Sequence, residues 1–347
     1  MDYGRVADLP IAIEAVELTQ REQETSSGFA RTTTVVTLRG EGHVGRGEDV
    51  TYDAEDHRAL AESGPFPLEG TYTLDSFAET VASTDLFPDG PQRPPSRRYR
   101  RWGLESAALD LGLRQAGLDF GEVFERTYDP TRFVVSTALG ESPSFDRIAR
   151  LREVYPDVEL KLDPVPAWTA KLIDRLAATD AVRILDLKGQ YAHADVHQPA
   201  TPSLYKRVFG AFPAAIVEDP ATSEETRPLL AEHADRLSWD VPVTDVDALE
   251  SLPHEPQWVN VKPSRIGSVE DLCAVVSYCQ DNDIAMYGGG QFELDVGRSQ
   301  IQALASLFYP DGPNDVAPSA FNDPEIEGGL PESPLDPPEA TPGFGTH

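Results

Sequence analysis

Basic residues are scarce in this chain. Its 347 residues include 59 acidic side chains but only 29 lysines and arginines, which gives a formal net charge of -30. This surplus repels the phosphates of nucleic acids and the head groups of anionic membranes, so we expect neither as a partner. Because the acidic residues are spread along the whole chain, the pattern is typical of a halophilic protein surface.

Lysine is the scarcest charged residue, and each lysine is therefore informative. The chain has Lys161, Lys171, Lys188, Lys206 and Lys262. Lys262 follows the alternating run Trp258-Val-Asn-Val and stands directly before Pro263. Because proline cannot donate a ladder hydrogen bond, the predicted strand must end there. A lysine at the end of a short buried strand needs either an ion-pair partner or a chemical role.

Cysteines and long apolar runs are also few. Cys273 and Cys279 lie six positions apart on a predicted helix and point to different sides, so we expect no disulfide between them. The N-terminal residues lack the apolar run of a signal peptide, and no apolar stretch approaches the length of a membrane span. We therefore expect a reduced, cytoplasmic protein.

The first 125 residues predict an α+β capping domain. Residues 11–18 and 31–38 alternate or are rich in β-branched side chains, which favours strands. The glycines at 40, 42, 45 and 47 indicate hairpin turns, because no helix follows them as a phosphate-binding loop would require. Residues 74–117 have a helical pattern.

From residue 131 the chain alternates strands and helices. Eight such units are typical of a closed parallel (β/α)8 barrel at residues 126–321, of the TIM type. The expected strands are 132–137, 158–162, 181–186, 214–218, 236–240, 258–262, 284–287 and 315–318. An open, doubly wound sheet is the alternative, but the glycine-rich dinucleotide turn is missing. The Pro- and Gly-rich residues 322–347 predict an irregular tail that packs back on the capping domain.

Five polar residues end successive predicted strands: Lys161, Asp186, Glu218, Asp240 and Lys262. In a barrel, the carboxyl ends of the strands meet at one mouth, so three carboxylates would lie side by side with a lysine on each flank. Crowded carboxylates repel one another, and a divalent cation would remove that repulsion. Oxygen ligands with open positions suit Mg²⁺, with Mn²⁺ as an alternative, and the absence of His and Cys at these ends disfavours zinc.

The two flanking lysines fit proton transfer beside such a cation. A metal-bound carboxylate substrate has an acidified α-proton, and a lysine near the metal has a lowered pKa that lets it act as a base. Lys161 and Lys262 would approach the substrate from opposite faces. The simpler alternative is that both lysines form structural ion pairs with the three acids.

Several motifs together resemble the enolase superfamily, in its muconate-lactonising and o-succinylbenzoate-synthase branch. They are Gly45-Arg-Gly-Glu48, Trp102-Gly-Leu-Glu-Ser-Ala-Ala-Leu-Asp110, Val217-Glu-Asp-Pro220, Val259-Asn-Val-Lys-Pro-Ser-Arg-Ile-Gly267 and Gly288-Gly-Gly-Gln-Phe-Glu293 with Arg298. The resemblance covers nearly the whole chain. It implies a modified (β/α)8 barrel with an N-terminal α+β capping domain, and a Lys base with Mg²⁺.

By that resemblance, Asp186, Glu218 and Asp240 match the metal ligands, and Lys161 and Lys262 match the acid/base pair. The usual Lys-x-Lys of strand two is here either Glu159-Leu-Lys161 or, in a shifted register, Lys161-Leu-Asp163. The usual Asp-x-Asn is Asp186-Leu-Lys188, so Lys188 either binds a substrate carboxylate or forms an outer ion pair. Asp245 is a rival of Asp240, although it also marks a helix start.

The remaining candidates concern the substrate. Glu293 would contact Lys262 or the substrate, Ser264 would line the site, and Phe29 would close over it. The resulting prediction is a Mg²⁺-dependent isomerase or lyase that abstracts the proton α to a carboxylate and forms a metal-stabilised enediolate. Racemisation or epimerisation, cycloisomerisation, and β-elimination all remain open, as does the substrate. The alternative is a non-catalytic relative that has lost one lysine. We expect a small-molecule carboxylate as ligand and a homo-oligomer.

Overall fold

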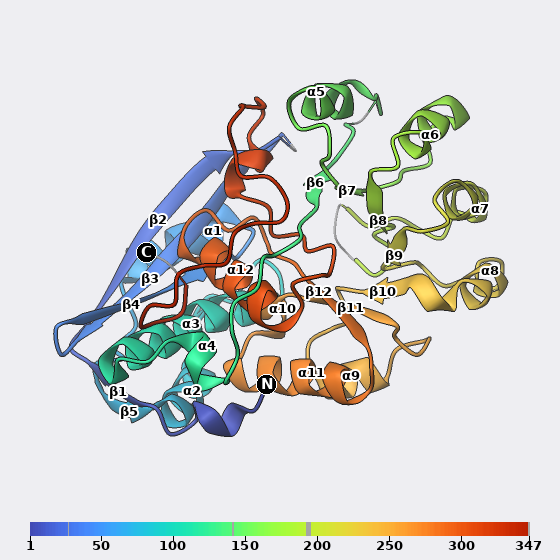
Figure 1. Cartoon of the computed structure of the whole chain (residues 1–347). Coiled ribbons are helices and arrows are strands. Elements are labelled where there is room, and N and C mark those ends of the chain that lie inside the picture. The colour runs from blue at the N-terminus through green and yellow to red at the C-terminus, as the bar shows by residue number, and fades with distance from the viewer. Residues whose placement is uncertain (27, 141, 192–195, 346–347) are drawn as a thin grey trace.

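The N-terminal part of the chain forms two small antiparallel sheets against a long helix (Figure 1). A computed structural model describes residues 1–26, 28–140, 142–191 and 196–345. Strands β2 (Ala15–Glu24), β3 (Ala30–Gly40) and β4 (His43–Asp49) make one sheet, and β1 (Pro10–Ile13) pairs with β5 (Gly70–Thr73). The helices are η1 (Tyr3–Arg5), α1 (Ala54–Ser63), α2 (Leu74–Ser83), α3 (Ser96–Ala116) and α4 (Phe120–Val123).

Glycine lets β4 lie directly on α3. A Cβ on Gly47 would come within 2.1 Å of the backbone oxygen of Gly103, so no larger residue fits. The turn between β3 and β4 has φ values of 51° at Glu41 and 77° at Gly42, as a tight hairpin requires. The predicted hairpin is therefore confirmed.

Two predictions for this region are wrong in detail. The strand predicted at 11–18 is divided at Glu14, because its first half pairs with β5 and its second half with β3. The helix predicted at 74–117 is interrupted between α2 and α3. That interruption contains prolines 88, 91, 94 and 95, which cannot continue a helical hydrogen-bond ladder.

Residues 135–288 form a seven-stranded parallel sheet in the order β12-β11-β10-β9-β8-β7-β6. The strands are β6 (Val135–Thr137), β7 (Leu160–Leu162), β8 (Val182–Asp186), β9 (Ile216–Glu218), β10 (Leu237–Trp239), β11 (Trp258–Val261) and β12 (Ala285–Gly288). The helices are α5 (Asp146–Val154), α6 (Ala170–Ala177), α7 (Pro202–Ala211), α8 (Arg227–Glu232), η2 (Ala234–Arg236), α9 (Val246–Glu250), α10 (Pro263–Ile266), α11 (Val269–Asp281), α12 (Val296–Phe308) and η3 (Ser319–Asn322). Figure 1 shows α5 to α8 fanned along the outer side of the curved sheet.

The eighth strand position of the barrel is not occupied by a regular strand. Two isolated parallel bridges, Phe133 with Asn314 and Gly289 with Asp315, connect the two edges of the sheet. The Asn314 side chain replaces part of the missing ladder: its amide donates to the carbonyl of Arg132, and its oxygen accepts from the amide of Gly288. The strand predicted at 315–318 is therefore wrong, although its first residue joins the barrel.

The segment after the barrel runs back along the molecule. Leu335 bridges Thr131, and Phe344 is buried with its ring 4.3 Å from that of Phe120 and 6.3 Å from that of Trp102. Residues 346–347 of the predicted tail lie outside the described residues. In the described part of the chain, no helix has both the length and the apolar character needed to cross a membrane.

Candidate active site

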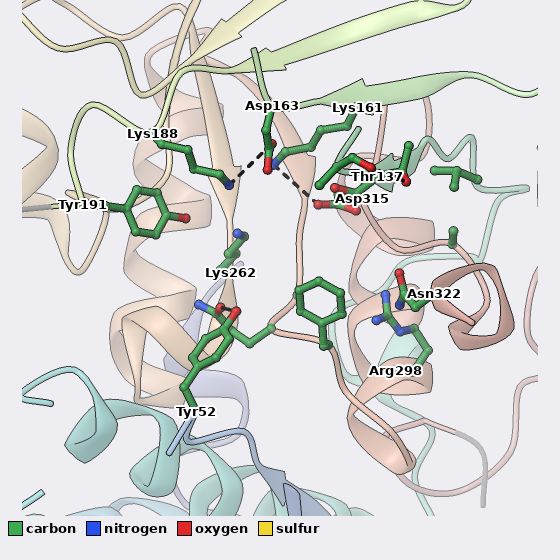
Figure 2. Close-up of a pocket in the computed structure, with 17 residues that line it drawn as sticks. Tyr52, Thr137, Lys161, Asp163, Lys188, Tyr191, Lys262, Arg298, Asp315 and Asn322 are labelled. Atoms are coloured by element: carbon green, nitrogen blue, oxygen red, sulfur yellow. Dashed lines mark hydrogen bonds and ion pairs between the residues drawn. The ribbon is translucent and has the colours of Figure 1, made fainter. Parts of the chain in front are cut away.

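The five predicted strand-end residues lie at one end of the parallel sheet. Lys161 is in β7, Asp186 and Glu218 are the last residues of β8 and β9, and Asp240 directly follows β10. Lys262 follows β11 and is the N-cap of α10. All five side chains are buried. Lys161 and Lys262 line a pocket, which Figure 2 shows in close-up with both lysine side chains among the residues around it.

Lys161 is held by a carboxylate inside the barrel. Its Nζ lies 2.6 and 2.9 Å from the two carboxylate oxygens of Glu218, and 3.5 Å from Asp315 Oδ2. Glu159 instead pairs with Arg132 and Arg183, each at 2.6 Å. Lys161 thus reaches the carboxylates from strand two, and Asp163 lines the same pocket, so the contacts are compatible with both registers. Burial acts to lower the pKa of Lys161, but Glu218 and Asp315 outweigh it and raise the pKa well above its ordinary value.

Lys262 is held in a similar way by Asp240. Its Nζ lies 2.8 Å from Asp240 Oδ2, and Arg265 Nε lies 2.9 Å from Asp240 Oδ1. Burial acts to raise the pKa of Asp240, but Arg265 and Lys262 hold it well below its ordinary value. Sequence reasoning missed Arg265, although its position three residues after Lys262 on a short helical turn places both on one face.

Lys188 lies on the third carboxylate. Its backbone N–H donates to Asp186 Oδ1 at 3.0 Å, and its Nζ donates to Asp186 Oδ2. The same Nζ is 3.6 Å from Asp163 Oδ1. The ion pair that the sequence suggested is therefore present, and the side chain also lines the pocket.

Three further residues hold the carboxylates or the loop that presents them. Asp219 accepts the backbone N–H groups of Asp240 at 2.9 Å and Val241 at 3.0 Å, which fixes the loop that presents Asp240. The Tyr287 hydroxyl donates to Glu218, and Asn260 donates to the same oxygen at 3.1 Å. Burial raises the pKa of Glu218, and Lys161 offsets only part of this effect.

These residues have the ligand atoms that a divalent cation prefers, but their side chains are not arranged to bind one. Three buried carboxylates supply the hard oxygen ligands that Mg²⁺ prefers. Within the described ranges, however, no group of three or more His, Cys, Asp and Glu side chains is arranged to hold a metal. The reason is visible in the contacts above, because an ammonium or guanidinium group lies on each carboxylate. A cation therefore fits only if at least one of these groups moves.

The pocket itself is small and mostly polar. It holds about 100 Å³, less than the ~300 Å³ at which typical ligand pockets begin, because long side chains project into it. Arg298 lines it, and its Nε is buried without a hydrogen-bond partner among the described residues. Asp315, the first residue of the wrongly predicted eighth strand, also lines the pocket.

The remaining candidates are placed as follows. Glu293 lies 3.3 Å from Arg298 and accepts the backbone N–H of Gln291, so its expected contact with Lys262 is not among its interactions in the described residues. Ser264 is buried in α10 and is not among the residues that line the pocket. Phe29 packs edge-on against Phe292 at 5.5 Å, and Phe292 lines the pocket. Asp245 caps α9 by accepting from Ala248, as its helix-start pattern predicted.

Solved structures share this fold over nearly their whole length. The chain matches a muconate lactonizing enzyme from Pseudomonas putida with a TM-score of 0.69 and 19% identity, over 96% of both chains. A muconate cycloisomerase from Pseudomonas fluorescens matches with a TM-score of 0.69 and 16% identity, over 97% of this chain and 96% of that one. At these identities the likeness concerns the fold.

Curated relatives carry two further names. An o-succinylbenzoate synthase of Bacillus subtilis (strain 168) is 22% identical over 67% of this chain and 63% of its own length. An N-succinylamino acid racemase of Amycolatopsis sp is 26% identical over 64% of this chain and 61% of its own length. The match thus spans less than two thirds of each of these proteins.

A family profile matches both halves of the chain. Residues 4–123 match the N-terminal domain and residues 127–323 the C-terminal domain of the family described as domain of unknown function DUF8230. The chain belongs to this family, and its fold and relatives are those of the muconate-lactonising and o-succinylbenzoate-synthase branch of the enolase superfamily.

Proposed function

We propose that this protein is an enzyme that abstracts the proton α to a substrate carboxylate, with Lys161 and Lys262 as its acid/base pair and a divalent cation, Mg²⁺ or Mn²⁺, on Asp186, Glu218 and Asp240. The enediolate that results is then reprotonated, cyclised or relieved of a β-leaving group. The names of the relatives favour an isomerase or lyase of the o-succinylbenzoate-synthase or N-succinylamino acid racemase kind.

The observation that carries this proposal is the placement of the two lysines. Lys161 belongs to β7 and Lys262 follows β11, and three strands separate these in the sheet order. In an eight-staved barrel, strands four positions apart lie on opposite walls. Both lysines line the same pocket. A substrate α-carbon between them would therefore meet an amine on each face.

Each lysine can move one proton between its Nζ and the α-carbon. The lysine that starts as the neutral amine takes the α-proton and becomes an ammonium, and the lysine on the other face can return a proton to the same carbon. In the contacts above both amines are held as ammonium groups by Glu218 and Asp240. A bound divalent cation supplies positive charge beside the substrate carboxylate, which lowers the pKa of the α-proton.

Burial around the pocket supports such chemistry. Asp186, Glu218 and Asp240 have no exposed surface, and Lys161 and Lys262 are 2% and 6% exposed. In so dry a site electrostatic interactions are stronger than in water, and proton transfer competes less with solvent. The alternative is a non-catalytic relative that lacks one of the two lysines at its site. Lys161 and Lys262 both line the pocket, which favours the catalytic proposal.

The test is exchange of the α-proton for deuterium in D₂O, followed by NMR. The panel contains N-succinyl and other N-acyl amino acids, dipeptides and cyclic carboxylates, with Mg²⁺ at high ionic strength. We expect exchange on at least one compound that depends on Mg²⁺ and falls by about 10²–10⁴-fold in Lys161→Ala and in Lys262→Ala. The exposed Lys171→Ala serves as the matched control and should exchange at the rate of the natural chain.

The pattern of loss also assigns the faces. A lysine that takes the proton from one enantiomer is needed for exchange of that enantiomer, whereas the opposite lysine is needed for inversion. Exchange that persists unchanged in both lysine variants would contradict the proposed acid/base pair. Exchange without any divalent cation, after dialysis against EDTA, would contradict the proposed metal.

A further inference from the structure

The ammonium group of Lys188 lies between two carboxylates. It donates to Asp186, the candidate metal ligand at the end of β8, and lies 3.6 Å from Asp163 Oδ1, on the loop after β7 (Figure 2). That oxygen of Asp163 is buried and accepts no hydrogen bond within the described residues. Asp163 thus offers Lys188 a second partner that is only weakly used.

Each candidate metal ligand already carries a cation. Asp186 holds Lys188, Glu218 holds Lys161, and Asp240 holds Lys262 and Arg265. Two further carboxylates, Asp163 and Asp315, lie 3.6 Å from Lys188 and 3.5 Å from Lys161. A divalent cation that binds Asp186 would compete with the Lys188 ammonium for the same carboxylate, so that ammonium has to leave.

Lys188 is the resident cation that is best able to leave. The side chain of Lys188 is 17% exposed, compared with 2% for Lys161 and 7% for both Lys262 and Arg265. Lys188 has Asp163 beside its ammonium, and Asp163 Oδ1 accepts no hydrogen bond within the described residues. Lys161 also has an outer carboxylate, Asp315 at 3.5 Å, but two hydrogen bonds to Glu218 hold its ammonium in place. A rotation about its side-chain bonds would exchange one carboxylate for the other.

We propose that Lys188 is an internal counter-ion that holds Asp186 in the metal-free protein and moves its ammonium to Asp163 when a divalent cation binds. The identity of the incoming cation rests on the proposed function, but the exchange between the two carboxylates does not depend on which reaction follows. Lys188 then sets the metal affinity of the site, because the cation must displace it from Asp186.

The backbone selects the variants. Lys188 has a φ of 53°, a left-handed conformation that asparagine adopts with little strain. Lys188→Asn therefore removes the ammonium while it suits the backbone, and Lys188→Met keeps the length of the side chain. Asp163→Asn removes the second partner. Lys171→Met, at an exposed position on α6, is the matched control.

The experiment measures binding of Mn²⁺ alone, by electron paramagnetic resonance of the free ion, with Mg²⁺ as a competitor at constant pH and ionic strength. Loss of a charge-assisted hydrogen bond that competes with the metal changes affinity by about tenfold or more. We therefore expect Lys188→Asn and Lys188→Met to bind Mn²⁺ at least about tenfold more tightly than the natural chain. Asp163→Asn should bind it more weakly, and this weakening should largely disappear in the Lys188→Met background.

Thermal unfolding supplies a second readout. Without metal, Lys188→Met leaves Asp186 buried without its ammonium, so it should melt at a lower temperature than the natural chain and regain more stability on addition of Mn²⁺. Equal or weaker Mn²⁺ binding in both Lys188 variants would overturn the proposal, as would independent effects of Asp163→Asn and Lys188→Met. Tighter binding without α-proton exchange on any compound would support the counter-ion and count against the proposed reaction. Exchange with unchanged metal affinity would do the reverse.

Discussion

The buried charges of the capping domain and those of the barrel mouth are held in different ways. In the capping domain, Arg31 donates to the backbone carbonyls of Gln291, Thr51 and Val50. Arg100 donates to Asp49 and to the carbonyls of Leu86 and Asp56. Backbone carbonyls stay where the fold puts them, so these guanidinium groups are fixed structural parts.

At the barrel mouth, the ammonium groups rely on side chains instead. Within the described residues, the hydrogen bonds of the Lys161 amine go to Glu218 and those of the Lys262 amine to Asp240. A carboxylate side chain can accept a metal or a different cation in place of the lysine. The comparison teaches that burial alone does not mark a functional charge. What distinguishes the mouth is that the partners of its charges can be exchanged.

The largest expected effect is a loss of activity at the mouth with little loss of stability. Lys262→Met should lower the rate of α-proton exchange by about 10²–10⁴-fold, because it removes one of the two acid/base groups. Stability should change much less, because Arg265 still lies 2.9 Å from Asp240 and keeps that carboxylate paired. Exchange by NMR and unfolding in urea measure the two quantities.

The exposed Lys206→Met on α7 is the control for both measurements. A large loss of stability with normal exchange in the remaining folded protein would show that Lys262 is a structural residue. The mouth and the capping domain would then not differ as proposed.

In the capping domain we expect the opposite result: a large loss of stability with a normal rate of α-proton exchange. Arg100→Met leaves Asp49 buried without its ion pair, which typically costs about 3–5 kcal/mol of unfolding free energy. The folded fraction should still exchange α-protons at the normal rate. Urea unfolding followed by circular dichroism measures the loss, and Arg39→Met, whose pair with Glu17 is exposed, should show no measurable change.

The sequence predicted the mouth better than it predicted its contacts. Strand ends could be read from apolar runs and from Pro263, and in a barrel those ends meet at one place, so the five polar residues could be grouped without a structure. Which cation lies on which carboxylate could not be read in this way. The contact of Lys188 with Asp186 depends on a φ of 53° at Lys188, which no local pattern announces.

Other failures have equally local causes. The eighth stave could not be foreseen as two bridges, because the Asn314 side chain takes over backbone hydrogen bonds that a strand would have made. Asp219 was hidden in the Glu-Asp-Pro motif, where its role is to accept two backbone N–H groups of the next loop. The predicted adaptation to high salt remains a prediction.

Substitutions of two glycines, one in the capping domain and one at the mouth, compare how rigidly the two regions are packed. Their expected losses of stability are smaller than that of Arg100→Met. A Cβ at Gly47 would meet the backbone oxygen of Gly103 at 2.1 Å, whereas a Cβ at Gly289 would meet Lys262 Cε at 2.7 Å and Asn260 Oδ1 at 2.4 Å. Overpacking typically costs about 1–3 kcal/mol when the neighbour cannot yield. We expect Gly47→Ala to lose about this much stability, and Gly289→Ala to lose less stability but to exchange α-protons more slowly, because the Lys262 side chain is displaced.

Both variants are measured as above, with Gly210→Ala as the control, because nothing lies within 4 Å of a Cβ added there. Equal losses of stability and equal rates of exchange in Gly47→Ala and Gly289→Ala would mean that the mouth is as rigid as the capping domain. In that case the Lys262 side chain would be held as rigidly as the buried groups of the capping domain, against the contrast drawn here.

The smallest effect concerns pH and tests whether the buried pair in the capping domain is permanently charged. Burial acts to raise the pKa of Asp49, but Arg100 and His57 outweigh it and lower the pKa. A carboxyl with a lower pKa in the folded protein adds stability above its unfolded pKa of about 3.9, and this stability is lost as the pH falls towards the folded value.

The natural chain should therefore be more stable than Asp49→Asn at pH 7, and the difference should narrow below about pH 4, by at most about 1.4 kcal/mol per pH unit. Urea unfolding at constant ionic strength measures this difference. A difference that stays constant down to pH 3 would mean that the pKa of Asp49 is the same in the folded and unfolded chains, so Arg100 would not hold the carboxylate in its charged form. A difference that grows as the pH falls from neutral would mean that burial raises the pKa of Asp49 and that Arg100 holds its carboxylate poorly, and the contrast with the exchangeable pairs of the mouth would be lost.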